Sequence, residues 1–243
     1  FIPSSRMKKA KANNASHYVW ELDGSPPILG AHSIAKHQVL KEYLEKYVSI
    51  LAARPVQDPL RLTLVDGFAG GGAYMHTKSR ERLPGSPLIM TQAMADAEAA
   101  AKEVRRKDFF LNVEYIFIEK QQPTIDFLAR ELRESKAASE QMERIHLLRG
   151  CFSEHLEQVL CRVEQRGRSR RVIFVLDQYG FSDVRMSDLR RIFKRLPNAE
   201  VILTIAIDWL IDHWTEKANY DQILTDLGIN LSSKFATEIK EAH

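Results

Sequence analysis

The sequence predicts an α/β fold built on a doubly wound, mostly parallel sheet. Five short apolar runs alternate with longer segments in which apolar residues recur every three or four positions, the spacing of one helix face. The runs at 62–65 and 172–176 lack the polar alternation of a half-exposed strand, so we expect both of their faces to be buried. Alternating strands and helices of this kind form parallel sheets with right-handed crossovers.

Local signals along the chain predict the individual elements. A helix over 31–53 comes before the first strand, and its apolar side chains form a single stripe. Ser86, followed by a proline, is a suitable N-cap for a helix that runs through 88–104. Pro123 opens the next helix, and Ser153 is the expected N-cap of the one after it. The predicted strands cover residues 62–65, 113–119, 145–148, 172–176 and 201–207.

A chain of 243 residues suits one α/β domain with additional segments at its ends. Residues 1–30 are polar and carry several lysines, so we expect a flexible arm. Residues 31–215 hold the alternation of strands and helices and form the predicted domain. Residues 216–243 have a helical pattern that stops without a cap, which predicts the start of a further region.

Composition excludes some classes of protein. No run approaches the roughly 18 apolar residues of a membrane span, so we expect a cytoplasmic protein. The only cysteines, Cys151 and Cys161, are too few for a zinc site, and we expect reduced thiols and no metal. The formal net charge is +3 and the pI is near 8.8, so binding to nucleic acid would need local basic clusters.

The stretch from Leu62 to Tyr74 passes from a predicted buried strand into an acid and then into a run of glycines. Asp66 stands at the carboxyl end of that strand, where ligands of open α/β sheets bind. Glycines in the loop permit positive φ and leave the backbone open to close approach. The cofactor-binding candidates here are Asp66, Gly67, Phe68, Ala69, Gly70 and Gly72.

Several ligands use such a loop, and neighbouring residues discriminate among them. Gly67 and Gly72 have the spacing of a phosphate-binding P-loop, but the lysine and hydroxyl of that motif are missing, which disfavours nucleotide hydrolysis. Dinucleotide binding needs an acid roughly 20 residues past the last glycine, and Glu119 lies much further along. S-adenosylmethionine fits better, with Asp66 for its ammonium group and Glu119 for its ribose. A glycine-rich turn that binds no ligand remains an alternative.

Five segments together resemble class I methyltransferases that use S-adenosylmethionine, and more closely the three-Cys-motif partner (TcmP) family. They are Lys36-His37, Val65-Asp-Gly-Phe-Ala-Gly-Gly-Gly72, Gly85-Ser-Pro87, Ile118-Glu119 and Leu176-Asp-Gln-Tyr-Gly180. The resemblance covers roughly residues 31–215 and implies a Rossmann-like fold of the methyltransferase type, with a further C-terminal region. Cys151 and Phe152, which follow the third strand, and Asp177, which follows the fourth, join the predicted cofactor contacts.

The loop after the fourth strand resembles the catalytic motif of methyltransferases that modify exocyclic amines. In those enzymes an acid or amide and a backbone carbonyl accept the protons of the amine, while an aromatic ring stacks on the base. This chain has Asp177 as the acid, Gln178 in place of the first proline, and Tyr179 one residue early. We predict these three as catalytic residues; a plain loop-start acid is the alternative.

Lys36 and His37, on the helix before the first strand, also resemble a pair in ribosomal-RNA adenine methyltransferases that lies near the cofactor carboxylate. A cation there could neutralise that carboxylate, so both residues join the cofactor-binding candidates. A solvated helix face would explain them equally. His146, His155 and His213 lack metal-ligand spacing, and we expect no metal.

Basic residues cluster in four places, of which 80–82 follows the glycine loop and 185–195 follows the predicted catalytic loop. Both clusters could reach a phosphate backbone at the carboxyl edge of the sheet. Our leading hypothesis is therefore methylation of an exocyclic amine in DNA or RNA. The alternatives are a non-catalytic methyltransferase-like module that works with protein partners, and methylation of a protein or small molecule.

Overall fold

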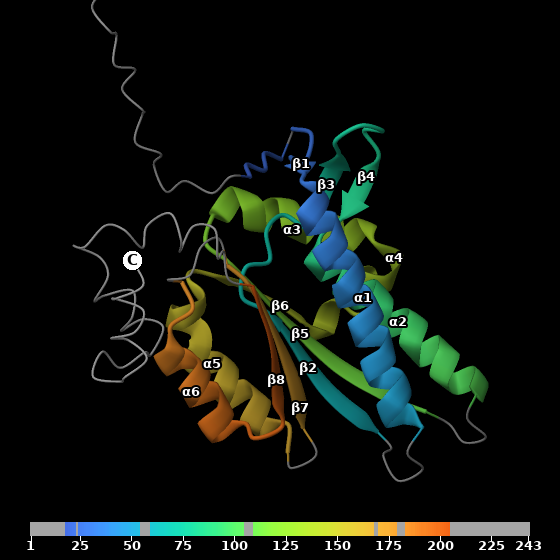
Figure 1. The fold of residues 1–243 in the computed structure, drawn as a ribbon, viewed down its shortest axis with the longest axis vertical. Helices are drawn as coiled ribbons and strands as arrows, with labels where there is room; N and C mark the ends of the chain where they lie inside the picture. The colour runs from blue at the N-terminus through green and yellow to red at the C-terminus, as the bar shows by residue number, and fades with distance from the viewer. Residues whose placement is uncertain are drawn as a thin grey trace, which may run out of the picture.

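The computed structural model describes residues 18–22, 24–53, 59–104, 109–167, 170–178 and 183–204. A five-stranded parallel sheet forms the centre of this part of the chain (Figure 1). Its strands, in spatial order, are β6 (Ile145–Arg149), β5 (Leu111–Glu119), β2 (Leu60–Asp66), β7 (Arg171–Asp177) and β8 (Ala199–Thr204). The order reverses between β2 and β7, as in doubly wound sheets, so the predicted α/β fold is confirmed.

Helices cover both faces of the sheet (Figure 1). One face carries α1 (Ala31–Ala52), α2 (Ser86–Val104), α3 (Gln122–Glu134) and the short α4 (Lys136–Ser139), and the single turn η1 (Met142–Arg144) follows them. The other face carries α5 (Phe152–Gln165) and α6 (Met186–Arg195). Every helix expected within the described residues is present. The apolar stripe predicted for the first helix is the buried face of α1, which includes Leu40, Leu44 and Val48.

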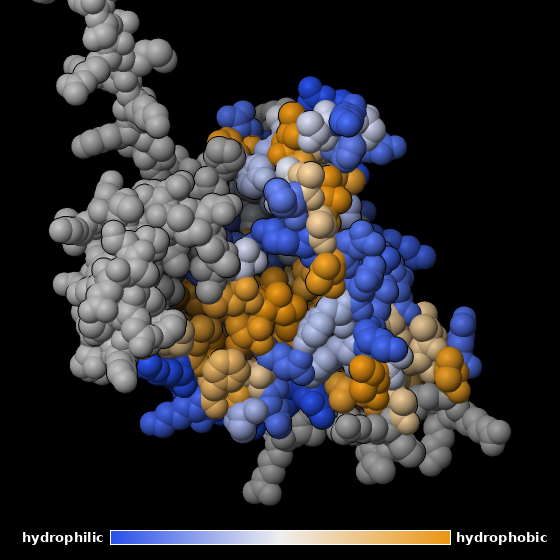
Figure 2. Space-filling model, viewed as in Figure 1, coloured by the Kyte–Doolittle hydropathy of each residue, from blue (hydrophilic) through white to orange (hydrophobic). Residues whose placement is uncertain are grey.

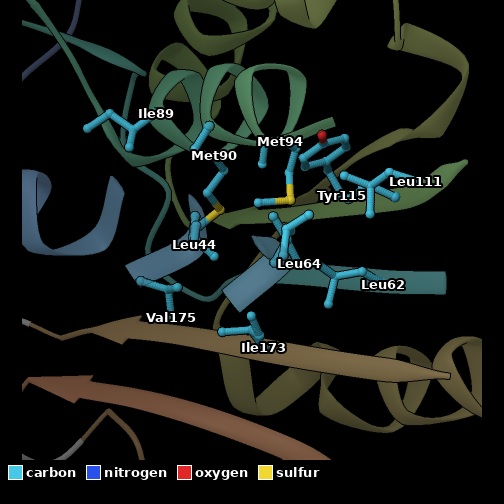
Figure 3. Packing of buried hydrophobic residues seen from close by; sticks show 14 of the residues in the cluster. Leu44, Leu62, Leu64, Ile89, Met90, Met94, Leu111, Tyr115, Ile173 and Val175 are labelled. Carbon is cyan, nitrogen blue, oxygen red and sulfur yellow. The ribbon is translucent and has the colours of Figure 1, made fainter. Parts of the chain in front are cut away.

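The larger core lies between the sheet and the α1–α2 layer (Figure 3). Leu62 and Leu64 of β2 project into it, and Thr63, between them in sequence, is buried as well. Met90 and Met94 of α2 fill the space above the strands. The absence of polar alternation in β2 is thus explained by helices on both faces.

A second core lies between the sheet and the α5–α6 layer and contains Val65, Phe152 and Phe174. The helix α5 begins differently from the prediction. Its N-cap is Cys151 and not Ser153, and the Cys151 N–H donates to the Glu154 carboxylate at 2.8 Å. The expected serine cap was wrong by two residues because the side chain of Glu154 reaches back to form this contact.

A small second sheet packs beside the glycine loop. It joins β1 (Ile28–Leu29), β3 (Ala73–His76) and β4 (Arg82–Pro84), the last two as an antiparallel hairpin. No strand was predicted for this hairpin, whose second half contains the basic cluster at 80–82. Part of the segment expected to be a flexible arm is also held in place, because Trp20 is buried and β1 pairs with β3. Residues 1–17 lie outside the described part.

The fifth strand, expected at 201–207, is described as far as Thr204, while residues 205–243 lie outside the described part. The proposed boundaries at 30 and 215 stay predictions.

Figure 2 shows apolar side chains between α1 and the grey atoms, on the face seen in Figure 1. On the α1 side of the sheet, Ile202 of β8 is only partly buried among the described residues.

Candidate functional site

Three acidic residues end adjacent strands at the carboxyl edge of the sheet. Asp66 ends β2, Glu119 ends β5 on one side of it, and Asp177 ends β7 on the other. All three were predicted from the sequence, and the structure brings them together. Burial is the main cause of the raised pKa of Asp66, and the negative charges of Asp177 and Glu119 act in the same direction. Cations stand at the same edge, because Lys36 pairs with Asp177 and Arg149 ends β6 in register with Glu119. The acid left for a positively charged ligand is the buried carboxyl of Asp66.

The glycine loop crosses the ends of the neighbouring strands and bonds to both. The N–H of Gly67 donates to the carbonyl of Val175 in β7 at 3.0 Å. On the other side, the N–H of Ala69 donates to the carbonyl of Ile118 in β5 at 3.0 Å. The N–H of Gly70 donates to Oε2 of Glu119 at 3.2 Å. The loop is therefore a fixed part of the sheet edge.

Two glycines of the loop are required by contacts within the chain. Gly70 has a φ of +58°, and a Cβ there would lie 3.1 Å from Trp20 and 3.2 Å from the hydroxyl of Tyr74. A Cβ on Gly71 would collide with the indole ring of Trp20. The indole is fixed in turn, because its Nε1 donates to the carbonyl of Ala73 at 2.8 Å. These glycines were expected to admit a ligand, and the packing of Trp20 already explains both.

Asp66 is the most deeply buried of the three acids. Its side chain is 1% exposed, and Oδ1 accepts the N–H of Phe68 at 3.0 Å. Oδ2 is buried and makes no hydrogen bond of normal geometry among the described residues, although the Ser86 side chain lies near enough to act against the rise in the carboxyl's pKa. Burial raises the pKa of this carboxyl to about 7. A buried acceptor without a partner is costly and usually marks a functional group or a missing donor. An ammonium group would supply that donor.

Lys36 and Asp177 form an ion pair that links α1 to the end of β7. Nζ of Lys36 lies 2.7 Å from Oδ1 and 2.6 Å from Oδ2 of Asp177, and both side chains are well over a third exposed. Lys36 was expected near the cofactor, and Asp177 in the catalytic loop; their contact was not predicted, since 141 residues separate them.

The aromatic candidates surround the loop. His37 is half-buried with its ring 5.9 Å from that of Tyr74, and burial lowers its pKa. Phe68 is half-buried and packs on the deeply buried Phe152, with 6.4 Å between the ring centres. Phe152 therefore supports the ring of Phe68 from within the core. Cys151, beside it, is half-buried at the start of α5.

The predicted catalytic loop is described in part. Gln178 is 4% exposed, and its Oε1 accepts the N–H of Val184 at 3.0 Å, so the side chain links the two ends of this loop. Sequence reasoning assigned Gln178 only a carbonyl acceptor and missed this link. Tyr179, the predicted stacking residue, lies outside the described residues.

No three side chains of the metal-ligating types gather closely enough to hold an ion within the described ranges. None of the helices in that part of the chain is long and apolar enough to span a membrane. No family model matches this chain, and no curated protein matches it.

Proposed function

We propose that this protein is a methyltransferase that uses S-adenosylmethionine and acts on an exocyclic amine of a nucleic-acid base. The observation that carries the proposal is the buried carboxyl of Asp66, whose Oδ2 makes no hydrogen bond of normal geometry although the Ser86 side chain is near, and which has two further carboxylates beside it. S-adenosylmethionine bears an ammonium, a sulfonium and one carboxylate, a net positive charge that this acidic edge would attract. The carboxylates around Asp66 would repel a phosphate placed in the glycine loop itself.

The chain's own groups divide the binding between them. Asp66 would accept a hydrogen bond from the ammonium through Oδ2, and ionisation of its carboxyl would then be favoured by the paired charge. Glu119 already uses both oxygens on backbone N–H groups, Oε2 with Gly70 and Oε1 with Gln121 at 2.9 Å. Each carboxylate oxygen can accept a second hydrogen bond, so ribose hydroxyls remain suitable donors.

Lys36 would act as an exchangeable partner. In this structure its ammonium occupies both oxygens of Asp177. The carboxylate of S-adenosylmethionine would compete for Lys36, and the departure of Lys36 would leave Asp177 able to accept a proton of the target amine. Partial exposure of both side chains keeps the cost of this exchange low.

When bound, S-adenosylmethionine would supply a methyl group on its sulfonium. Asp177 would orient the amine by accepting one N–H, and the carbonyl of Gln178 would accept the other. The amine lone pair forms the new C–N bond as the C–S bond breaks, and the extra proton of the product leaves to water. The protein would contribute by positioning the amine against the methyl group and by stabilising charge in the transition state. The bond from Gln178 to Val184 supports this role, because it fixes the loop where a proline would otherwise do so.

Two other functions stay open to the same site. A non-catalytic module would keep the cofactor pocket and the TcmP resemblance but transfer no methyl group. A methyltransferase of proteins or small molecules would share the cofactor chemistry and differ only in its acceptor. Membership of the TcmP family and a DNA or RNA substrate are parts of the proposal.

Calorimetry with S-adenosylmethionine and S-adenosylhomocysteine tests the cofactor, and transfer of a tritiated methyl group to mixed DNA, RNA and protein tests the reaction. We expect both ligands to bind, and Asp177→Ala to abolish transfer while changing cofactor affinity by less than about threefold, since Asp177 acts on the acceptor. Asp183→Ala, at the far end of the same loop, serves as the control. Cofactor binding without any transfer would favour the module, and no binding would refute the proposal.

A further inference from the structure

A cleft of about 420 Å³ opens at the amino ends of the strands, on the opposite edge of the sheet from the glycine loop. Its walls are the starts of β2, β5 and β6, the turn η1 and the end of α5. The volume is within the range of small-molecule sites, roughly 300–1,000 Å³. Charged and polar side chains form most of its lining, whereas small-molecule sites are usually apolar.

Positive charge dominates this cleft. The arginines of its lining are Arg61, Arg144, Arg162 and Arg166, and the carboxylates are Glu114 and Glu143. With His146 neutral, the four guanidinium groups exceed the two carboxylates by two charges. Burial and the neighbouring Arg162 both lower the pKa of His146, in keeping with this excess.

Two of the arginines are held in fixed positions. Glu114 accepts a hydrogen bond from Nη1 of Arg166 at 3.2 Å and another from Arg162. Nη2 of Arg166 donates to the carbonyl of Asn112 at 2.7 Å. Fixed guanidinium groups lose little freedom when a ligand binds, so this part of the cleft is preorganised.

The other two arginines are free to contact a ligand. Arg61 and Arg144 are exposed, and neither has a carboxylate partner among the described residues. Nη1 of Arg61 donates only to the carbonyl of Arg166, at 3.2 Å. The excess charge of the cleft is therefore on side chains whose donors are still available.

A second cleft of about 270 Å³ continues from the first along β6 and α5. His146 and Arg162 line both. Beyond them the lining includes the apolar residues Leu147, Leu148 and Val159, of which Val159 is fully buried and the two leucines are half-buried. The two clefts together offer a cationic end and a partly apolar end.

We propose that these joined clefts bind a small phosphate monoester that has an apolar or aromatic body. A phosphate monoester carries about −1.5 to −2 charges at neutral pH, which matches the excess of two positive charges. Arginine forks bind phosphate oxygens in pairs, and four of them meet here. The apolar body would lie along β6. This site is separate from the proposed cofactor site, so neither proposal depends on the other.

Titration calorimetry with phenyl phosphate and with inorganic phosphate tests the site. We expect saturable binding of both, with phenyl phosphate several-fold tighter because its ring reaches the apolar end. Arg61→Ala plus Arg144→Ala should weaken binding at least about tenfold, the effect of losing one charge-assisted hydrogen bond or more. Glu143→Gln should tighten binding, since it removes an exposed negative charge from the lining.

The control is Arg133→Ala plus Lys46→Ala, which changes the net charge equally at exposed positions outside the cleft and should leave affinity within about twofold. Saturating S-adenosylhomocysteine should not displace phenyl phosphate. Absence of saturable binding, or equal loss in the control, would overturn the site. Equal affinity for the two phosphates would refute the apolar end. Binding of a thymidine oligonucleotide without binding of phenyl phosphate would refute a small ligand.

Discussion

Protonation of the buried Asp66 carboxyl should make the stability of the domain depend on pH. Burial raises its pKa from 3.8 to about 7, so between those pH values the folded protein keeps a proton that the unfolded chain releases. Stability due to this group is therefore complete below about pH 4 and is lost as the pH rises to about 7. The loss is at most about 4 kcal/mol, at about 1.36 kcal/mol for each pKa unit between the two states.

Asp66→Asn removes this dependence, because an amide keeps the acceptor for the N–H of Phe68 and has no proton to lose. We expect the variant and the wild type to differ by less than about 1 kcal/mol near pH 4. At pH 8 the variant should be more stable by up to about 4 kcal/mol. The measurement is the free energy of unfolding in urea at several pH values, with the exposed Asp126→Asn as the control.

Contributions from other titrating groups cancel in the difference between variant and wild type, so the comparison isolates Asp66. If the difference in unfolding free energy between the two proteins stayed constant with pH, the raised pKa of Asp66 would be refuted. If the wild type became more stable relative to the variant as the pH rises, the predicted direction of the pH dependence would be refuted. Saturating S-adenosylmethionine should stabilise the wild type at pH 8 and leave Asp66→Asn nearly unchanged, since the ligand's ammonium needs the ionised carboxylate.

Three further predictions follow from contacts around the loop. Gly71→Ala should destabilise the domain by about 1–3 kcal/mol, because the added methyl collides with Trp20, and a shift in tryptophan fluorescence should accompany the loss. Lys36→Met should change unfolding free energy by less than about 1 kcal/mol, as expected for an exposed pair, yet weaken cofactor binding in calorimetry; unchanged affinity would contradict the exchange with Asp177. Gln178→Ala should increase proteolysis between 178 and 184 at constant global stability, and equal cleavage rates would contradict the link to Val184.

The acids of the site could be predicted because each one follows its own buried strand. The alternation of strands and helices places Asp66, Glu119 and Asp177 at one edge, whatever the details of packing. Each acid can be recognised from the apolar run just before it. Because parallel strands end at the same edge of a sheet, acids that follow adjacent strands lie close together. Similarly, the bounds of α1 and β5 could be derived within a few residues from periodicity and apolar runs.

Contacts between segments far apart in the sequence could not be predicted from local patterns. Lys36 meets Asp177 only because α1 starts beside the carboxyl end of β7. The arginine-lined cleft at the amino ends of the strands combines residues from four separate stretches of sequence, and no local pattern connects them. The position of Trp20 was missed since its neighbourhood reads as a polar tail, and a single aromatic residue does not alter that average. Such features depend on the folded arrangement more than on local composition.

The contact between Trp20 and the glycine loop also determines where the domain can be cut. The sequence pattern places the domain boundary near residue 30, so a shortened chain would naturally begin with α1. That truncation would delete Trp20 and β1 together, uncover the loop at Gly71 and remove a strand from the small sheet. The folded unit therefore extends further toward the amino end than the start of α1 suggests. A useful expression boundary would precede Tyr18, whose ring packs 5.9 Å from that of Trp20.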